Sequence, residues 1–204
     1  MKLGHLLIGL VGLIVAFFLF KPDSYEIKNA KPRGESIVCF GDSLTFGTGA
    51  TKGMSYPDQL SRMIGKPVIN LGVPGDTTAD ALARLETVLD KNPRMVLMTI
   101  GGNDLMRGVP KDQAFGNLRK IVERIQQTGA LVVIGGIEVP LLGRGFGEEY
   151  QQLSRQTGSV LIENVLDGII GHNDLMSDTI HPNSQGYTLM AEAFYQAIKP
   201  YLSR

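Results

Sequence analysis

The stretch from Ile37 to Thr45 reads IVCFGDSLT, an apolar run that leads into a Gly-Asp-Ser turn. Its β-branched and aromatic residues predict a buried strand, so Ser43 comes directly after that strand. In an open α/β sheet, side chains at the carboxyl ends of the strands reach the crevice where ligands bind, and the following helix offers N–H groups to an anion. Ser43 is therefore a candidate nucleophile, although the same triplet also suits an ordinary helix cap.

Similar apolar runs recur along the chain and alternate with longer amphipathic segments. We expect strands at Ile37–Phe40, Pro67–Leu71, Met95–Ile100, Leu131–Gly135 and Val160–Ile162. Helical patterns occupy Tyr56–Ile64, Thr78–Asp90, Lys111–Gln127, Phe146–Thr157 and Ser184 to about Leu202. We expect Ser55, Thr78, and Asn183 or Ser184 to cap three of these helices. The alternation predicts an α/β fold with about five parallel strands and helices on both faces of the sheet.

Composition and charge fit a single globular domain with a substantial core. The chain has 204 residues, 43% of them hydrophobic, and its 20 Lys and Arg balance its 20 Asp and Glu. Without a net positive charge or a basic stripe with interleaved aromatics, we expect no nucleic-acid partner. The single cysteine, Cys39, excludes disulfides within the chain and cysteine-based zinc sites, and its setting predicts a buried strand thiol.

The N-terminus differs from the rest of the chain. Leu6–Phe20 is an unbroken run of apolar residues and glycine, which at ~1.5 Å per residue approaches the ~30 Å of a bilayer's hydrocarbon core. A small-x-small cleavage site is hard to find, so an uncleaved membrane anchor over residues 1–20 is favoured over a signal peptide. Residues 21–35, with two prolines and mixed charge, predict a tether to a domain spanning 36–204.

Four polar clusters fall at strand ends or in loops. They are Gly41–Ser43, Asn70–Asp76, Gly101–Asp104 and Asp178–His181. The first three follow predicted strands and so belong to one edge of a parallel sheet, whereas the fourth precedes the last helix. A serine hydroxyl needs a base to take its proton, and acyl transfer also needs an acid that orients the base and donors for the oxyanion. The four clusters contain each of these groups.

The candidate base is His181, because Asp178 lies three residues before it in a turn. At that spacing the carboxylate can hold the imidazole Nδ1–H and leave Nε2 facing Ser43. His172, which could pair with Asp174, remains an alternative base.

The candidate oxyanion donors come from two other clusters. Gly75 offers its backbone N–H and Asn103 its side-chain NH₂, alongside the N–H of Ser43. Taken singly, Gly75 also suits a turn and Asn103 also suits a helix cap. Their joint appearance at successive strand ends favours the oxyanion hole.

These motifs together resemble the SGNH hydrolase superfamily, also called GDSL esterases and lipases. The four blocks appear in order as Gly41-Asp42-Ser43, Gly75, Gly102-Asn103-Asp104 and Asp178-x-x-His181. The resemblance covers nearly everything from Ser36 to Leu202. It implies a flavodoxin-like three-layer α/β/α sandwich, a triad of Ser43, Asp178 and His181, and an oxyanion hole from Ser43, Gly75 and Asn103, with no cofactor or metal.

The runs Asn70–Thr77 and His181–Asn183 look most like the bacterial branch of small esterases with thioesterase and lysophospholipase activity. The resemblance implies a serine hydrolase that cleaves carboxylic or thio acyl esters, either lipid-derived or small aryl and alkyl esters. A carbohydrate O-acetyl esterase or an O-acyltransferase could use the same triad. From the apolar N-terminus we expect a domain that is membrane-anchored or exported, on the periplasmic side of the inner membrane, although the positive charges on the two flanks of this segment do not settle its orientation. Val73-Pro74 departs from the family pattern and leaves the chain-length preference open.

Two other classes use similar motifs. A metallophosphoesterase also has Gly-Asp and Gly-Asn at strand ends, but here Asp104 rather than a histidine follows Asn103, and a two-metal site would be poor in histidine. A nucleotide-binding module is suggested by Gly47-Thr48-Gly49, yet no complete phosphate-loop motif follows. The esterase hypothesis accounts for more of the chain than either alternative.

Overall fold

Five parallel strands form one sheet in the computed structural model, which describes residues 25–138 and 145–202. Their order in the sheet is β2-β1-β3-β4-β5. They are β1 (Ser36–Gly41), β2 (Val68–Gly72), β3 (Pro93–Thr99), β4 (Leu131–Gly135) and β5 (Val160–Ile162). The predicted parallel sheet is confirmed, and every strand end lies within two residues of its expected position.

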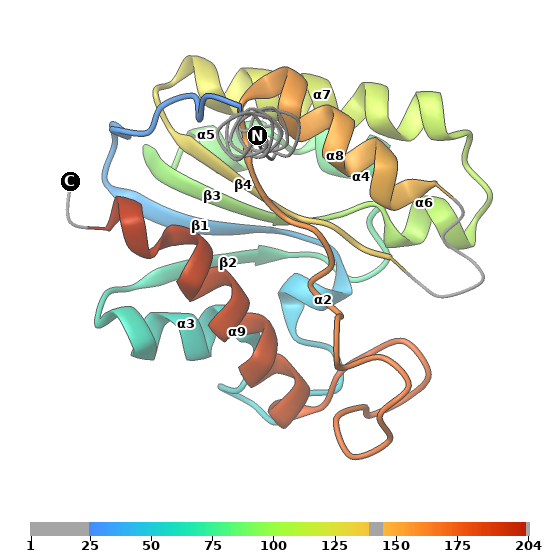
Figure 1. The fold of residues 1–204 in the computed structure, drawn as a ribbon. Helices are drawn as coiled ribbons and strands as arrows, with labels where there is room; N and C mark the ends of the chain where they lie inside the picture. Colours follow the sequence, from blue (N-terminus) through green and yellow to red (C-terminus); the bar gives the residue numbers. More distant parts are fainter. Residues whose placement is uncertain (1–24, 139–144, 203–204) are drawn as a thin grey trace, which may run out of the picture.

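Helices cover both faces of this sheet, as Figure 1 shows. On one face lie α3 (Tyr56–Ile64) and α9 (Ser184–Ile198). On the other lie α4 (Thr78–Ala83), α5 (Glu86–Leu89), α7 (Lys111–Gln127) and α8 (Phe146–Thr157). Two short helices, α2 (Ser43–Phe46) and α6 (Gly102–Met106), follow β1 and β3, and a 3₁₀ turn (Lys199–Tyr201) follows α9. The fold is thus the expected three-layer α/β/α sandwich.

The core lies around the three central strands. β1, β3 and β4 are almost entirely buried, whereas the edge strands β2 and β5 are partly exposed, as expected for a sheet covered on both faces. Tyr56 stacks on Phe194 with ring centroids 4.8 Å apart and so joins α3 to α9. Cys39 is fully buried in β1, as predicted.

Most helix ends follow the sequence signals. Ser55 caps α3 in a capping box with Asp58, and Asn183 caps α9. The expected cap Thr78 is wrong: Thr77 caps α4, because the Thr78 hydroxyl instead donates to a carboxylate outside the helix. The expected continuous helix Thr78–Asp90 is also wrong, since it breaks between α4 and α5, at Arg84 and Leu85.

The strand order locates the crevice of the sheet. After β1 the chain moves outward to β2 and then returns to the other side of β1 to form β3. The connections therefore diverge at the carboxyl ends of β1 and β3, which is where open α/β sheets bind ligands. The turns after these two strands carry Ser43 and Asn103.

Residues 25–35, assigned above to a tether, lie against the domain where the structure describes them. Tyr25 Oη donates to the carbonyl of Ser159 at 2.7 Å, and Asn29 Nδ2 donates to the carbonyls of Gln126 and Ala130, each at 2.9 Å. The expected anchor, residues 1–20, lies outside the described residues. Within residues 25–138 and 145–202, no helix has the length and apolar character needed to cross a membrane.

Candidate active site

Ser43 is the first residue of α2, at the carboxyl end of β1. Asp42 is the N-cap of that helix, and its Oδ1 accepts a hydrogen bond from the Leu44 N–H at 3.0 Å. Gly41 allows β1 and β3 to approach closely here, because a Cβ at this position would lie 2.1 Å from the Thr99 carbonyl oxygen. The turn is therefore a helix cap through Asp42, and it also presents Ser43 at the crevice.

His181 and Asp178 come from the loop before α9. Asp178 Oδ1 accepts hydrogen bonds from the N–H groups of Ile180 and His181, both at 2.8 Å, which fixes the turn. The other oxygen, Oδ2, lies 2.7 Å from His181 Nδ1, and His181 Nε2 lies 3.0 Å from Ser43 Oγ. The hydrogen bond from His181 lowers the pKa of Asp178 to about 2. The structure thus places the three residues in one hydrogen-bonded chain.

The alternative histidine, His172, lies in the same long loop between β5 and α9. It is exposed in a turn, where its N–H donates to the Ile169 carbonyl at 3.1 Å and its own carbonyl accepts from the Leu175 N–H at 2.9 Å. The imidazole that contacts Ser43 belongs to His181. This geometry favours His181 over His172 as the base.

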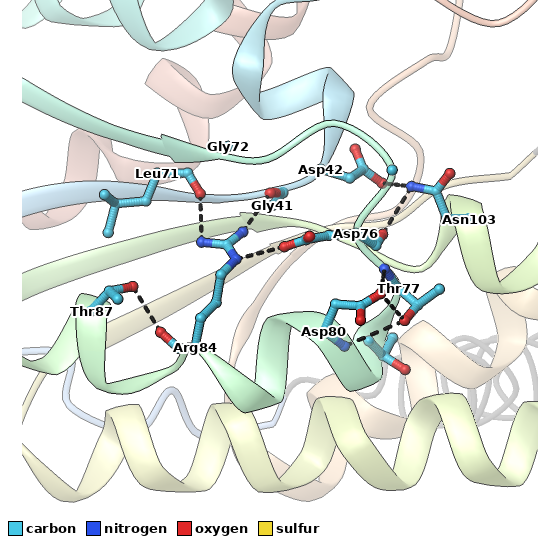
Figure 2. Close-up of polar contacts among 12 residues, drawn as sticks. Gly41, Asp42, Leu71, Gly72, Asp76, Thr77, Asp80, Arg84, Thr87 and Asn103 are labelled. Carbon is cyan, nitrogen blue, oxygen red and sulfur yellow. Dashed lines mark hydrogen bonds and ion pairs between the residues drawn. The ribbon is translucent and has the colours of Figure 1, made fainter.

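Asn103, in α6, lies between the nucleophile turn and the loop that carries Gly75 (Figure 2). Its Nδ2 donates to the Asp76 carbonyl at 2.9 Å and lies 3.4 Å from Asp42 Oδ2. Gly75 has a φ of 87°, a left-handed conformation that favours glycine, and its carbonyl accepts from Arg107 Nη2 at 2.8 Å. Asn103 is therefore hydrogen-bonded both to Asp42 and to the residue that follows Gly75.

A cavity of about 290 Å³ lies beside Ser43. Its polar lining includes Ser43, Asn103 and His181, and Gly75 is not part of the lining. The rest is mostly aliphatic, with Leu44, Leu105, Met106, Ile137, Leu166, Ile170 and Ile180. An apolar hollow with a few convergent polar groups is the usual form of a small-molecule site.

The chemistry available at this cavity is nucleophilic. A serine hydroxyl in contact with an imidazole that is oriented by a carboxylate is the arrangement required for acyl transfer. Over the described ranges 25–138 and 145–202, no group of three or more His, Cys, Asp or Glu side chains is placed to hold a metal ion.

Comparison with known proteins assigns the family. The model of the GDSL-like lipase/acylhydrolase family matches residues 39–189, a range that includes Ser43, Gly75, Asn103, Asp178 and His181. The chain belongs to this family. It is accordingly a serine hydrolase of carboxylic esters, and the resemblance to SGNH hydrolases is confirmed.

Individual relatives agree with this assignment. An arylesterase of Vibrio mimicus is 31% identical over 185 residues, covering 85% of this chain and 92% of the relative. The thioesterase 1/protease 1/lysophospholipase L1 of Escherichia coli K12 is 27% identical over 178 residues, covering 83% and 86%. The crystal structure of the psychrotrophic esterase EstA from Pseudoalteromonas sp., inhibited by monoethylphosphonate, is 28% identical with a TM-score of 0.75, covering 83% and 99%.

Asp42, the acid of the Gly-Asp-Ser-Leu motif of this family member, is almost completely buried. Burial raises the pKa of its carboxyl to about 7, helped by the negative charges of Asp76 and Asp104 and opposed by the hydrogen bond from Leu44. A carboxyl that is protonated in part at neutral pH places less negative charge beside Ser43 than a fully ionised one. Asp42 therefore braces the turn, and its raised pKa reduces the negative charge that it places beside Ser43.

Asp76 and Asp104 belong to two of the polar clusters seen in the sequence, and no role was predicted for either. The Asp104 carboxylate accepts from the N–H and the hydroxyl of Thr78, at 2.8 and 2.7 Å, and so holds the start of α4. Asp76 accepts from Asn103 through its carbonyl. The only sequence signal was their proximity to Gly75 and Asn103, because their partners depend on which strands lie next to each other.

Proposed function

We propose that Ser43 attacks the acyl carbonyl, that His181 takes its proton and gives it to the leaving alcohol or thiol, and that Asp178 orients the imidazole. Water then cleaves the acyl-enzyme, with His181 again acting as the base. The observation that carries this proposal is the chain of contacts from Asp178 Oδ2 to His181 Nδ1, 2.7 Å, and from His181 Nε2 to Ser43 Oγ, 3.0 Å.

In this proposal the N–H groups of Ser43 and Gly75 and the side-chain amide of Asn103 hold the oxyanion. The two contacts of Asn103 Nδ2 support its part. The 2.9 Å hydrogen bond to the Asp76 carbonyl keeps the amide in place, while the 3.4 Å contact with Asp42 is long enough to yield to a substrate oxygen. One amide hydrogen therefore positions the side chain and the other is available to the reaction.

Asn103→Ala should lower kcat by about 10²–10³-fold, because it removes one oxyanion donor. KM should change far less, since that donor acts mainly on the transition state. Steady-state kinetics with p-nitrophenyl butyrate measures both constants. The matched control is Asn117→Ala. The native Asn117 amide donates to the Thr78 hydroxyl at 3.2 Å, and Asn117 does not line the cavity. Equal kcat values for the two variants would exclude Asn103 from the oxyanion hole.

The cavity favours acyl esters with a hydrocarbon chain. Among the residues that the structure describes, its aliphatic wall offers apolar surface to methylene groups and few partners to the hydroxyls of a sugar. Lysophospholipids, acyl thioesters and aryl esters of such acids all fit this proposal, because the triad acts on the carbonyl and not on the leaving group. The O-acetyl esterase alternative would need a preference for acetyl groups. The acyltransferase alternative would need an acceptor other than water.

Chain-length dependence tests the substrate proposal. Each methylene that enters the cavity should contribute about 0.8 kcal/mol, or about fourfold in kcat/KM, until the wall is filled. We therefore expect p-nitrophenyl butyrate and hexanoate to be better substrates than acetate, with the Ser43→Ala protein as the blank for spontaneous hydrolysis. A preference for acetate, or for acetylated xylan over all acyl chains, would favour the O-acetyl esterase.

The apolar segment Leu6–Phe20 supports the same substrate class. We infer that residues 1–20 anchor the chain in the inner membrane, with the hydrolase domain on the periplasmic side. An anchored hydrolase meets lipid-derived esters at high local concentration. Alkaline carbonate extraction of membranes that contain the full chain tests the anchor, since release of the protein into the supernatant would exclude it.

A further inference from the structure

Arg84 ends α4, and its guanidinium contacts three separate parts of the crevice (Figure 2). Its side chain is only 20% exposed. The guanidinium carbon also lies 4.4 Å from the centre of the Phe40 ring, a cation–π contact that holds the group against β1. Arg84 also lies at the break between α4 and α5, which the periodicity does not show.

Two of the contacts join the ends of neighbouring strands. Arg84 Nη2 donates to the Gly41 carbonyl and Nη1 to the Leu71 carbonyl, both at 2.9 Å. The pairing of β1 with β2 ends at Gly41 and Gly72. The guanidinium therefore bonds to the two strands where their mutual hydrogen bonding ends. Gly41 is two residues before Ser43, and the chain after Gly72 leads to Gly75.

The third contact of Arg84 is with Asp76, in the loop that carries Gly75. Arg84 Nε lies 2.5 Å from Asp76 Oδ2, in an ion pair whose carboxylate side chain is only 11% exposed. Asp76 follows Gly75 directly, and its carbonyl accepts the 2.9 Å hydrogen bond from Asn103. One planar side chain thus contacts the end of the strand that precedes Ser43 and the carboxylate of Asp76, the residue that follows Gly75 and accepts from Asn103.

We propose that Arg84 is a positioning residue that sets the spacing between Ser43 and the oxyanion donors Gly75 and Asn103. This inference rests on the proposed function. A guanidinium presents its donors in fixed directions, so it can hold two carbonyls and a carboxylate at once, whereas the ammonium of lysine is a point charge on a flexible stem. Small displacements of catalytic groups are costly, because the reaction requires near-attack geometry.

Arg84→Lys is the decisive variant, because it keeps the charge beside Asp76 and removes the planar fork. We expect kcat for p-nitrophenyl butyrate to fall about 10- to 100-fold while KM changes little. The matched control is Arg62→Lys, where the native guanidinium also donates to a backbone carbonyl, that of Gly53 at 2.9 Å, but on the exposed side of α3. Thermal unfolding of each variant shows that kcat is measured well below its melting temperature.

If the role of Arg84 is purely structural, Arg84→Lys should lower the melting temperature and leave kcat of the folded protein equal to that of Arg62→Lys. That result would overturn the proposal.

Asp76→Asn provides a second test if Arg84→Lys does not fold. This variant keeps a near-isosteric side chain, weakens the ion pair, and should also lower kcat with little change in KM. Wild-type kcat in this variant would count against the inference.

The effect of Arg84→Lys should be smaller in an Asn103→Ala background than in the wild type, because part of the loss is then already present. Equal fold-losses in the two backgrounds would show that Arg84 does not act through Asn103 and would contradict the mechanism. The proposed function fails separately, if the wild-type protein shows no turnover that depends on Ser43.

Discussion

Ser43→Ala is expected to lower kcat for ester hydrolysis by about 10⁴- to 10⁶-fold, since removal of a serine nucleophile disables the whole triad. The fold should persist, because the Ser43 hydroxyl contacts His181 at the crevice and is not part of the core. Hydrolysis of p-nitrophenyl butyrate, followed beside thermal unfolding, gives both results.

A suitable control for this variant is Ser61→Ala. The Ser61 hydroxyl donates to the Lys66 carbonyl at 2.8 Å on the exposed side of α3, away from the cavity. We expect Ser61→Ala to retain wild-type turnover. A Ser43→Ala protein that is as active as this control would show that another group performs the attack.

Asp178→Asn should lower kcat by about 10⁴-fold, the second largest effect that we expect. The loss arises because the asparagine stabilises the wrong tautomer of His181. The asparagine Oδ1 can still accept from the N–H groups of Ile180 and His181, so the turn remains and the NH₂ faces Nδ1. That contact keeps the proton on Nε2, and the imidazole can then no longer accept the Ser43 proton. Steady-state kinetics measures the loss, with Asp174→Asn in the same loop as the control.

The pH dependence of this effect follows from the low pKa of Asp178. A carboxyl with a pKa of about 2 stays ionised at every pH well above that value, so the wild-type protein does not lose Asp178 function in mild acid. Because the pKa of Asp178 is below its value in the unfolded chain, the associated stability is present above the unfolded pKa and is lost as the pH falls toward 2.

A kcat for Asp178→Asn equal to that of Asp174→Asn would contradict the assignment of the acid.

The secondary structure could be predicted because its signals are local. The apolar run before Gly41 and the amphipathic period of Lys111–Gln127 each depend only on residues within one element. The break at Arg84 could not be read this way, because the periodic pattern continues through it. The contacts of Arg84 at this break are tertiary: its guanidinium donates to the carbonyls of Gly41 and Leu71, whose adjacency depends on the strand order.

The candidate site shows the same division. Motif residues such as Ser43 and Asn103 stand directly after strands, so the topology of a parallel sheet brings them to one edge. Asp76 and Arg84 are eight residues apart, and neither charge nor spacing indicated that they would form an ion pair beneath that edge. The residues proposed to perform the chemistry carried a recognisable pattern, whereas those proposed to hold them in place did not.

Covalent labelling with a fluorophosphonate tests the central claim most directly, because such probes react with an activated serine. Peptide mass spectrometry of the labelled wild-type chain should find one adduct per chain, on Ser43, with hydrolysis lost in proportion to labelling. The Ser43→Ala chain should remain unlabelled. A stoichiometric adduct on another residue, or full activity in a chain labelled at Ser43, would contradict the account.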